Sequence, residues 1–124
     1  MTDVVVRESP GRGRGVFANR DFSTGEIIEI CPVIVLPDHD IPKIDQTVLA
    51  QYYFGWSGPE GSAALGLGFA LLYNHSETPN AACHKDLTER TIFFIALRDI
   101  RNGEEIFYRY NTGPAGDPVW FEVR

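Results

Sequence analysis

Residues 73–80 read Tyr-Asn-His-Ser-Glu-Thr-Pro-Asn and follow directly on an apolar run that begins at residue 63. The octapeptide brings an amide, an imidazole and a hydroxyl in succession to the end of a segment that is apolar enough to be buried. Such groups need hydrogen-bond partners when they are buried, because an unsatisfied one costs about 1–3 kcal/mol. They therefore either hold a turn together or hold a ligand. A metal is not expected, since His75 has no second His or Cys three or four residues away and His84 is nine residues on.

Two further stretches are candidates for the same site. Residues 11–15 read Gly-Arg-Gly-Arg-Gly, which lets the backbone approach a ligand but fits neither a dinucleotide fingerprint nor a P-loop. A turn between strands is the alternative for this segment. Tyr108 and Tyr110 stand two residues apart, so on a strand they point to the same face. Two hydroxyls on one apolar face indicate a pocket with a polar end, whereas the alternative for each aromatic is a place in the core.

Length and composition favour one globular domain over residues 1–124, with 44% apolar and 23% charged residues. No run reaches the ~18 apolar residues of a membrane span, and the N-terminus does not resemble a signal peptide, so an intracellular location is expected, cytoplasmic by default. Nuclear or host-delivered locations stay open. The formal net charge is −6 and no long basic block is present, which argues against direct nucleic-acid binding and favours a Lys-rich protein partner. Cys31 and Cys83 match neither a disulfide framework nor a zinc site and are expected to be buried thiols.

Short apolar runs separated by turn signals predict a mainly β fold. The predicted strands are residues 4–7, 15–18, 27–30, 33–36, 91–97 and 105–110, and Asn102-Gly103 predicts a hairpin between the last two. Apolar residues four apart (Ile44, Val48, Tyr52) predict one helix over residues 45–54. The run 63–73 contains two glycines and is expected to be a short buried helix or an irregular turn. Asp117-Pro118 predicts the start of a short helix that continues through Trp120.

An internal echo links residues 18–28 to residues 96–106 at an offset of 78. The two segments agree at Ala, Arg, Asp, Gly, Glu and Ile, which is six of eleven positions. Two similar strand-turn-strand units related by a pseudo-two-fold would produce this pattern, and chance is the other explanation.

Taken in order, three segments resemble the SET domain of protein-lysine methyltransferases. They are Gly13-Arg14-Gly15-Val16-Phe17, the stretch 69–80 with Asn74-His75-Ser76 at its centre, and the stretch 98–110 that ends at Tyr108-Arg109-Tyr110. The resemblance covers about residues 5–121 and is greatest to minimal stand-alone members of viral type. It implies a β-clip fold of several small sheets with short helices and a C-terminal pseudoknot.

The resemblance also implies the positions of the site residues. S-adenosylmethionine would be bound by Gly13, Arg14, Gly15, Asn74, His75 and Tyr110. The substrate lysine would enter an aromatic channel formed by Tyr52, Tyr108, Trp120 and Phe121, and the catalytic residues would be Tyr110 and Tyr108. No metal is implied.

The implied function is transfer of a methyl group from S-adenosylmethionine to the ε-amine of a lysine in a protein or peptide, with histones and histone-like proteins in the substrate class. The alternative is a catalytically silent SET-like module that binds lysine-bearing partners. Two departures from the family pattern matter. Arg109 stands where members usually have Asp and is expected to point away from the two tyrosines. Post-SET cysteines are absent, so the channel must be closed by residues 117–123 or by a second chain, and monomer and homodimer both remain open.

Overall fold

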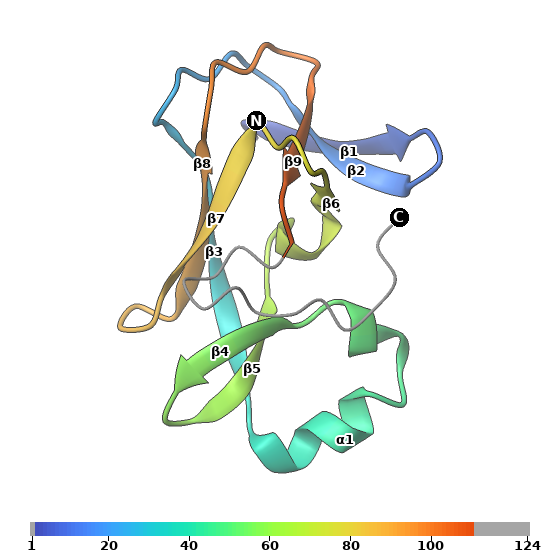
Figure 1. The fold of residues 1–124 in the computed structure, drawn as a ribbon, viewed down its shortest axis with the longest axis vertical. Helices are drawn as coiled ribbons and strands as arrows, with labels where there is room; N and C mark the ends of the chain where they lie inside the picture. The colour runs from blue at the N-terminus through green and yellow to red at the C-terminus, as the bar shows by residue number, and fades with distance from the viewer. Residues whose placement is uncertain (1, 111–124) are drawn as a thin grey trace.

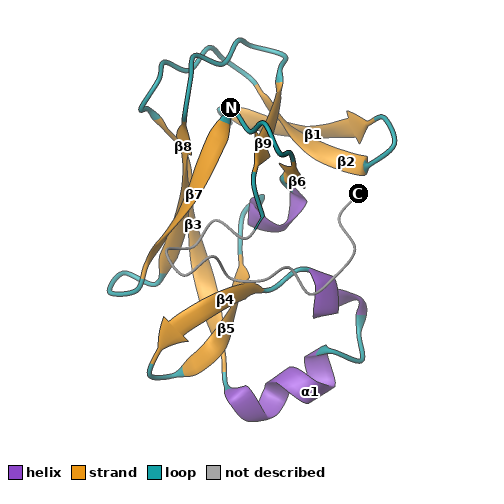
Figure 2. Cartoon of the chain, in the orientation of Figure 1, coloured by secondary structure: helices purple, strands orange, loops and turns teal. Residues whose placement is uncertain are grey.

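The computed structural model describes residues 2–110, which form mainly short β-strands (Figure 1; Figure 2). The strands are β1 (Val4–Ser9), β2 (Gly13–Ala18), β3 (Ile27–Leu36), β4 (Phe54–Gly58), β5 (Gly61–Gly66), β6 (Asn74–His75), β7 (Ala81–Asp86), β8 (Thr91–Ala96) and β9 (Glu105–Tyr108). The helical segments are α1 (Ile41–Ile44) and the 3-10 turns η1 (Asp38–Asp40), η2 (Val48–Gln51) and η3 (Ala70–Leu72). The predicted mainly β class is confirmed. Each helical segment in this part of the chain has at most four residues, far fewer than a membrane crossing requires.

The strands lie side by side in the order β1-β2-β9-β7-β8-β3-β5-β4, and β6 pairs with β9. The long strand β3 joins two parts of the molecule, because its first half pairs with β8 and its second half pairs with β5 (Figure 1). The strands predicted at 27–30 and 33–36 are therefore one strand. Pro32, which has no N–H for a sheet hydrogen bond, lies where β3 changes partner.

Reciprocal hydrogen bonds confirm the pseudo-two-fold suggested by the internal echo. Phe22 and Ile100, which are equivalent in the two copies, exchange both backbone bonds, at 2.8 and 2.9 Å. The amide of Gly25 donates to the carbonyl of Ala96 at 2.8 Å, and the equivalent amide of Gly103 donates to the carbonyl of Ala18 at 2.9 Å. Side chains follow the same relation.

In the two copies, Asp99 Oδ1 accepts from the amide of Thr24 at 2.9 Å, and Asp21 Oδ1 accepts from the amide of Asn102 at 2.8 Å.

The same symmetry explains why the hairpin prediction at Asn102-Gly103 was wrong. A turn is present and Gly103 has a φ of +93°, but it connects β8 to β9, which do not pair with each other. Each strand pairs instead with a strand of the other copy: β9 with β2, and β8 with β3. A dipeptide reports the bend of the chain but not the partner of the strand that follows.

The helix predicted over residues 45–54 is absent. The chain makes one turn of α1, and Thr47 is extended, with its hydroxyl accepting from the amide of Leu49 at 3.1 Å and so starting the separate turn η2. Val48, a member of the expected apolar stripe, is 77% exposed. A short helix gains little stability when it has no apolar face to bury. Trp56, which continues the apolar pattern, is instead 6% exposed in strand β4. Tertiary packing therefore overrides the helical period.

The run 63–73 contains a strand that the sequence did not predict. Residues 61–66 form β5, and only the short turn η3 within the run is helical. Ala63 and Ala64 are both buried, so the strand lacks the alternation that marks a half-exposed sheet. A Cβ added at Gly66 would lie 2.6 Å from the Cβ of Ala70, so close packing of η3 on β5 requires glycine. Strands β4, β6 and β7 were also missed. Strands β1, β2, β8 and β9 were predicted with shifted ends, β9 stopping at Tyr108 instead of Tyr110.

The hydrophobic core lies between the strands that flank the two echo segments, residues 18–28 and 96–106. The octapeptide at residues 73–80 lies on one side of it. Val16 and Ile106 are fully buried cross-strand partners in β2 and β9, and Ile92 and Phe94 of β8 are fully buried beside them. Burial of each such side chain contributes about 1.5–3 kcal/mol. Cys31 is buried as predicted, Cys83 is only half-buried, and both are free thiols. The core thus gives β9 a rigid place from which Tyr108 and Tyr110 project.

Candidate active site

The octapeptide at residues 73–80 lies directly against β9. Strand β6 runs parallel to β9 with Asn74 opposite Phe107 and His75 opposite Tyr108. Asn80, at the end of the octapeptide, is 2% exposed and clamps β9: its Nδ2 donates to the carbonyl of Glu105 at 2.9 Å, and its Oδ1 accepts from the amide of Phe107 at 2.8 Å. The polar groups thus find partners in the backbone of a segment that is distant in sequence.

Asn74 connects the octapeptide to the glycine-rich turn. Its Nδ2 donates to the carbonyl of Arg14 at 2.9 Å and to Oε2 of Glu105 at 2.9 Å. The other oxygen of Glu105 accepts from the Ser9 hydroxyl at 2.7 Å. A Cβ added at Gly15 would collide with the Glu105 carboxylate and lie 2.8 Å from Asn74 Nδ2. Gly15 is therefore required by a close approach, whereas Gly13 has open space around it and a φ of +79° that suits glycine.

His75 and Tyr73 both hold Tyr110. The amide of Tyr110 donates to Nδ1 of His75 at 3.0 Å, and the Tyr110 hydroxyl donates to the carbonyl of Tyr73 at 2.9 Å. The two rings of His75 and Tyr110 meet edge to face with centroids 5.1 Å apart. The backbone and the hydroxyl of Tyr110 are thus both fixed by the octapeptide.

Tyr108 lies at the centre of an aromatic cluster. Its ring centroid is 5.0 Å from that of Tyr110, 5.3 Å from Phe94, 6.4 Å from Tyr73 and 6.5 Å from Phe54. Burial raises the pKa of Tyr108 well above its ordinary value, with smaller contributions from Cys83 and Tyr110. Burial likewise raises the pKa of the Cys83 thiol to about 12. Both groups keep their protons at neutral pH, so neither can act there as a base.

Sequence reasoning missed the carboxylate of Glu29, which anchors the segment before the octapeptide. Its Oε1 accepts from the Tyr73 hydroxyl at 2.7 Å, and its Oε2 accepts from the amide of Phe69 at 3.1 Å. Burial and the adjacent Glu29 raise the pKa of Tyr73 far above its ordinary value. A signal was present, since Glu29 stands among Ile28, Ile30 and Cys31, and a carboxylate in such a run must be exposed or paired.

The remaining predicted residues are less closely placed. Tyr52 is half-buried at the end of η2, two residues before Phe54, and within residues 2–110 it makes no ring contact with Tyr108 or Tyr110. Arg14 contributes its backbone carbonyl. Trp120, Phe121 and the helix predicted from Asp117 lie outside the described residues.

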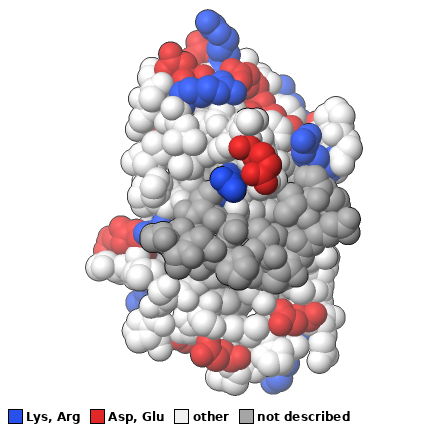
Figure 3. Space-filling view, in the orientation of Figure 1, with Lys and Arg blue, Asp and Glu red and all other residues white. Residues whose placement is uncertain are grey.

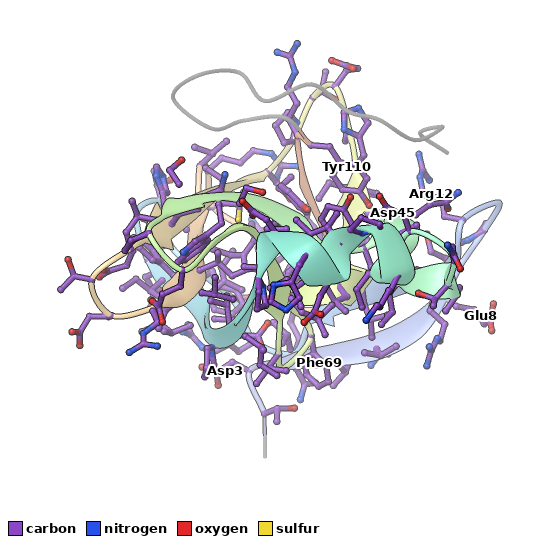
Figure 4. All side chains as sticks on the ribbon, turned by 90° about the horizontal axis from the view of Figure 1, so that it is seen from below. Asp3, Glu8, Arg12, Asp45, Phe69 and Tyr110 are labelled. Atoms are coloured by element: carbon purple, nitrogen blue, oxygen red, sulfur yellow. The ribbon has the colours of Figure 1, made fainter. Side chains whose placement is uncertain are left out.

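Figure 4 shows Tyr110 and Arg12 on one side of the molecule and Asp3 on the other. In the described part of the chain, no three His, Cys, Asp or Glu side chains come together as a metal site would require.

One surface hollow among residues 2–110 lies apart from the octapeptide. A hollow of about 720 Å³ lies between residues 37–39 and the turn at residues 56–62, away from Asn74, His75 and the tyrosines. Acidic and basic side chains are intermixed on the face seen in Figure 3, without a broad basic stripe among the described residues. The chemistry of the described residues is therefore concentrated where β6 and β9 meet.

Comparison with known proteins places this arrangement in a family. The SET domain model matches residues 13–111. The histone-lysine N-methyltransferase of Schizosaccharomyces pombe, described as specific for H3 lysine-37, is 36% identical over 118 residues, covering 94% of this chain and 76% of the relative.

Solved structures agree. A crystal structure of a Plasmodium falciparum protein, named as a candidate histone methyltransferase, matches with a TM-score of 0.73 and 29% identity over 93% of this chain and 98% of that one. A chain of the Chaetomium thermophilum Polycomb Repressive Complex 2 matches with a TM-score of 0.67 and 24% identity over 88% of this chain and 15% of that one, which supports the fold alone. The predicted fold, cofactor and reaction class are confirmed: the chain belongs to the SET domain family and is an S-adenosylmethionine-dependent protein-lysine methyltransferase.

Proposed function

We propose that this enzyme methylates a lysine of a histone, at a site in which Asn74 and His75 contact the cofactor and Tyr108 and Tyr110 contact the substrate lysine. Two observations support the substrate class. The relative from S. pombe is named for a histone H3 lysine. The chain itself has a formal net charge of −6, which favours encounter with a Lys-rich segment. A histone substrate would place the enzyme with chromatin.

The polar groups around Gly15 suit the charged end of S-adenosylmethionine. Gly15 lets the Glu105 carboxylate and the Asn74 amide come close to the backbone, since an added Cβ would collide with the first and crowd the second. Both donors of the Asn74 amide are in use, and its Oδ1 accepts no hydrogen bond from any residue in 2–110, so it remains able to receive the ammonium group of a ligand. We assign Gly13, Arg14 and Gly15 to this cofactor side, together with Tyr110, whose amide is bonded to His75.

The described residues act mainly by alignment. S-adenosylmethionine supplies an electrophilic methyl group on a positively charged sulfur, which a neutral amine can attack in line. An amine held by Tyr108 and Tyr110 in a fixed pose avoids most of the entropic cost of bringing two reactants together. The Tyr110 hydroxyl donates its proton to the carbonyl of Tyr73, so toward the reacting centre its oxygen can act only as an acceptor. Tyr52, Trp120 and Phe121 are assigned to the rest of the lysine channel.

The observation that carries this assignment is the convergence of His75, Tyr108 and Tyr110. His75 and Tyr110, which are 35 positions apart, are joined there by a hydrogen bond of 3.0 Å and a ring contact of 5.1 Å, and the ring of Tyr108 lies 5.0 Å from that of Tyr110.

Methylation assays on separated substrates test the substrate class. Nucleosomes, free core histones and poly-lysine are each incubated with the enzyme and S-adenosylmethionine that carries a radiolabelled methyl group. We expect label on a histone above the label on poly-lysine at equal lysine concentration. Label on poly-lysine alone, or equal label on both, would contradict histone recognition while leaving the enzyme class intact.

The single-turnover rate is expected to rise from about pH 7 to pH 9, following the neutral fraction of a lysine whose free pKa is ~10.4. The raised pKa values of Tyr108 and Cys83 leave both protonated over this range, so neither takes the lysine proton. Rapid-quench measurements at saturating cofactor give the profile. A flat profile would mean that proton removal is not limiting.

Tyr108→Phe is expected to shift the product toward trimethyl-lysine, and the wild-type enzyme is expected to yield mainly mono- or dimethyl-lysine. The ring of Tyr108 is buried, but its hydroxyl has no hydrogen-bond partner within residues 2–110 and is not fully enclosed, so it can retain a water in the space that further methyl groups would occupy. Mass spectrometry of one peptide at equal conversion measures the shift. Efficient trimethylation by the wild type, or an unchanged product in the variant, would make Tyr108 an ordinary channel aromatic.

A further inference from the structure

The tautomer of His75 is fixed by the two bonds that its ring makes. Nδ1 accepts the amide hydrogen of Tyr110 at 3.0 Å, so Nδ1 carries no proton. The neutral ring must then carry its proton on Nε2, which lies 3.1 Å from Oε1 of Glu77 and donates to it. The opposite tautomer would point two N–H groups at each other and release the backbone of Tyr110. A carboxylate behind a histidine favours one tautomer in this way in many metal and catalytic sites.

Glu77 is itself held in place by the residue that departs from the family pattern. Arg109 Nε lies 3.4 Å from Oε2 of Glu77, while Oε1 faces the histidine. Glu77 follows His75 by two residues and Arg109 precedes Tyr110 by one, so the pair joins the two segments whose alignment matters. The Glu77 and Arg109 side chains are 72% and 59% exposed, and such a surface ion pair contributes little to global stability. Arg109 is thus an exposed residue that reaches the site only through Glu77.

We propose that Glu77 is a positioning residue for methyl transfer, which holds His75 in the Nε2–H tautomer so that Nδ1 anchors the backbone of Tyr110. The proposal rests on the role proposed above for Tyr110. It extends the active site by a carboxylate that contacts neither substrate nor cofactor. The chain of contacts runs from Arg109 to Glu77, then to His75, and ends at Tyr110.

Glu77→Ala and Glu77→Gln separate this role from a general structural one. Glu77→Ala is expected to lower kcat about tenfold, the smaller end of the effect of removing an outer partner of a histidine. Glu77→Gln retains an oxygen that accepts from Nε2–H, so its kcat is expected to stay within about threefold of the wild type. Glu60→Ala is the matched control, because Glu60 also forms an exposed ion pair, at 3.2 Å from Arg90. It is expected to leave kcat unchanged.

Nitrogen-15 NMR of the imidazole provides a readout that a structural role would not move. In the folded enzyme without cofactor or substrate, we expect Nδ1 of His75 to be unprotonated in the wild type and in Glu77→Gln, and a mixture of tautomers in Glu77→Ala. The proposal is overturned if Glu77→Ala keeps the wild-type kcat, or if it loses activity with an unchanged tautomer. Absence of methyl transfer by the wild type would instead count against the proposed function, and the NMR comparison would still decide the tautomer.

Discussion

Tyr110→Phe is expected to lower the rate of methyl transfer by about 100-fold, by analogy with the loss of one oriented hydroxyl from a reacting centre. The hydroxyl is fixed by its 2.9 Å bond to the carbonyl of Tyr73, and the ring stands 5.0 Å from that of Tyr108. Phe keeps the ring and its packing, so the melting temperature is expected to change by only a few degrees. Single-turnover transfer at saturating cofactor measures the effect.

Tyr53→Phe is the matched control for this substitution. The Tyr53 hydroxyl also donates to an oxygen acceptor, Oδ1 of Asp45 at 2.8 Å, but that contact is exposed and involves no residue of the octapeptide. Its rate is expected to equal that of the wild type. Activity of Tyr110→Phe within about threefold of wild type would remove Tyr110 from the catalytic residues, since an oriented donor is worth far more.

Asn74→Ala and His75→Ala are each expected to weaken S-adenosylmethionine binding at least tenfold. Removing the Asn74 amide takes away the Oδ1 acceptor proposed for the ammonium group of the cofactor, and a lost partner in a half-buried site costs about 1–3 kcal/mol; it also removes the two donors that position Glu105 and Arg14. A loss of about 1.4 kcal/mol is already tenfold in affinity. Removing the imidazole releases the amide of Tyr110.

Titration calorimetry measures the cofactor affinity, and a thermal melt restricts the comparison to folded protein. Asn19→Ala serves as the control, because Asn19 also donates through its amide to a backbone carbonyl, that of Thr2 at 3.0 Å, away from the site. Wild-type affinity in both Asn74→Ala and His75→Ala would mean that the octapeptide holds a turn and not a ligand. Loss of the folded state in both would support the same conclusion.

The parts of the site that could be predicted from sequence are those set by local geometry. Two-residue alternation was enough to place Tyr108 and Tyr110 together, although β9 stops at Tyr108. The demand of polar groups for partners is met at Asn74 and His75, which bond to segments distant in sequence. The internal echo also held, because equivalent Asp, Gly and Glu residues make equivalent turns in both copies.

The remainder depends on contacts between distant segments. Asn80 bonds to residues 25 and 27 positions further along, and no local pattern names those partners. Strand β5 escaped prediction because small residues buried on both faces show no alternation. The false helix over 45–54 had the right period, but Thr47 is extended within it, and strand β4, which buries Trp56, begins at Phe54. In each case the energy of tertiary packing exceeds the local preference.

Mass spectrometry of histones incubated with the enzyme and S-adenosylmethionine carrying a deuterated methyl group tests the central claim most directly. The claim is that Tyr110 and its partners transfer methyl to a lysine ε-amine. The account predicts deuterated methyl groups on a defined histone lysine with the wild-type enzyme, and about 100-fold slower labelling with Tyr110→Phe. Cofactor binding by the wild type without any labelled lysine in histones or whole-cell lysate, or equal labelling by the two proteins, would contradict it.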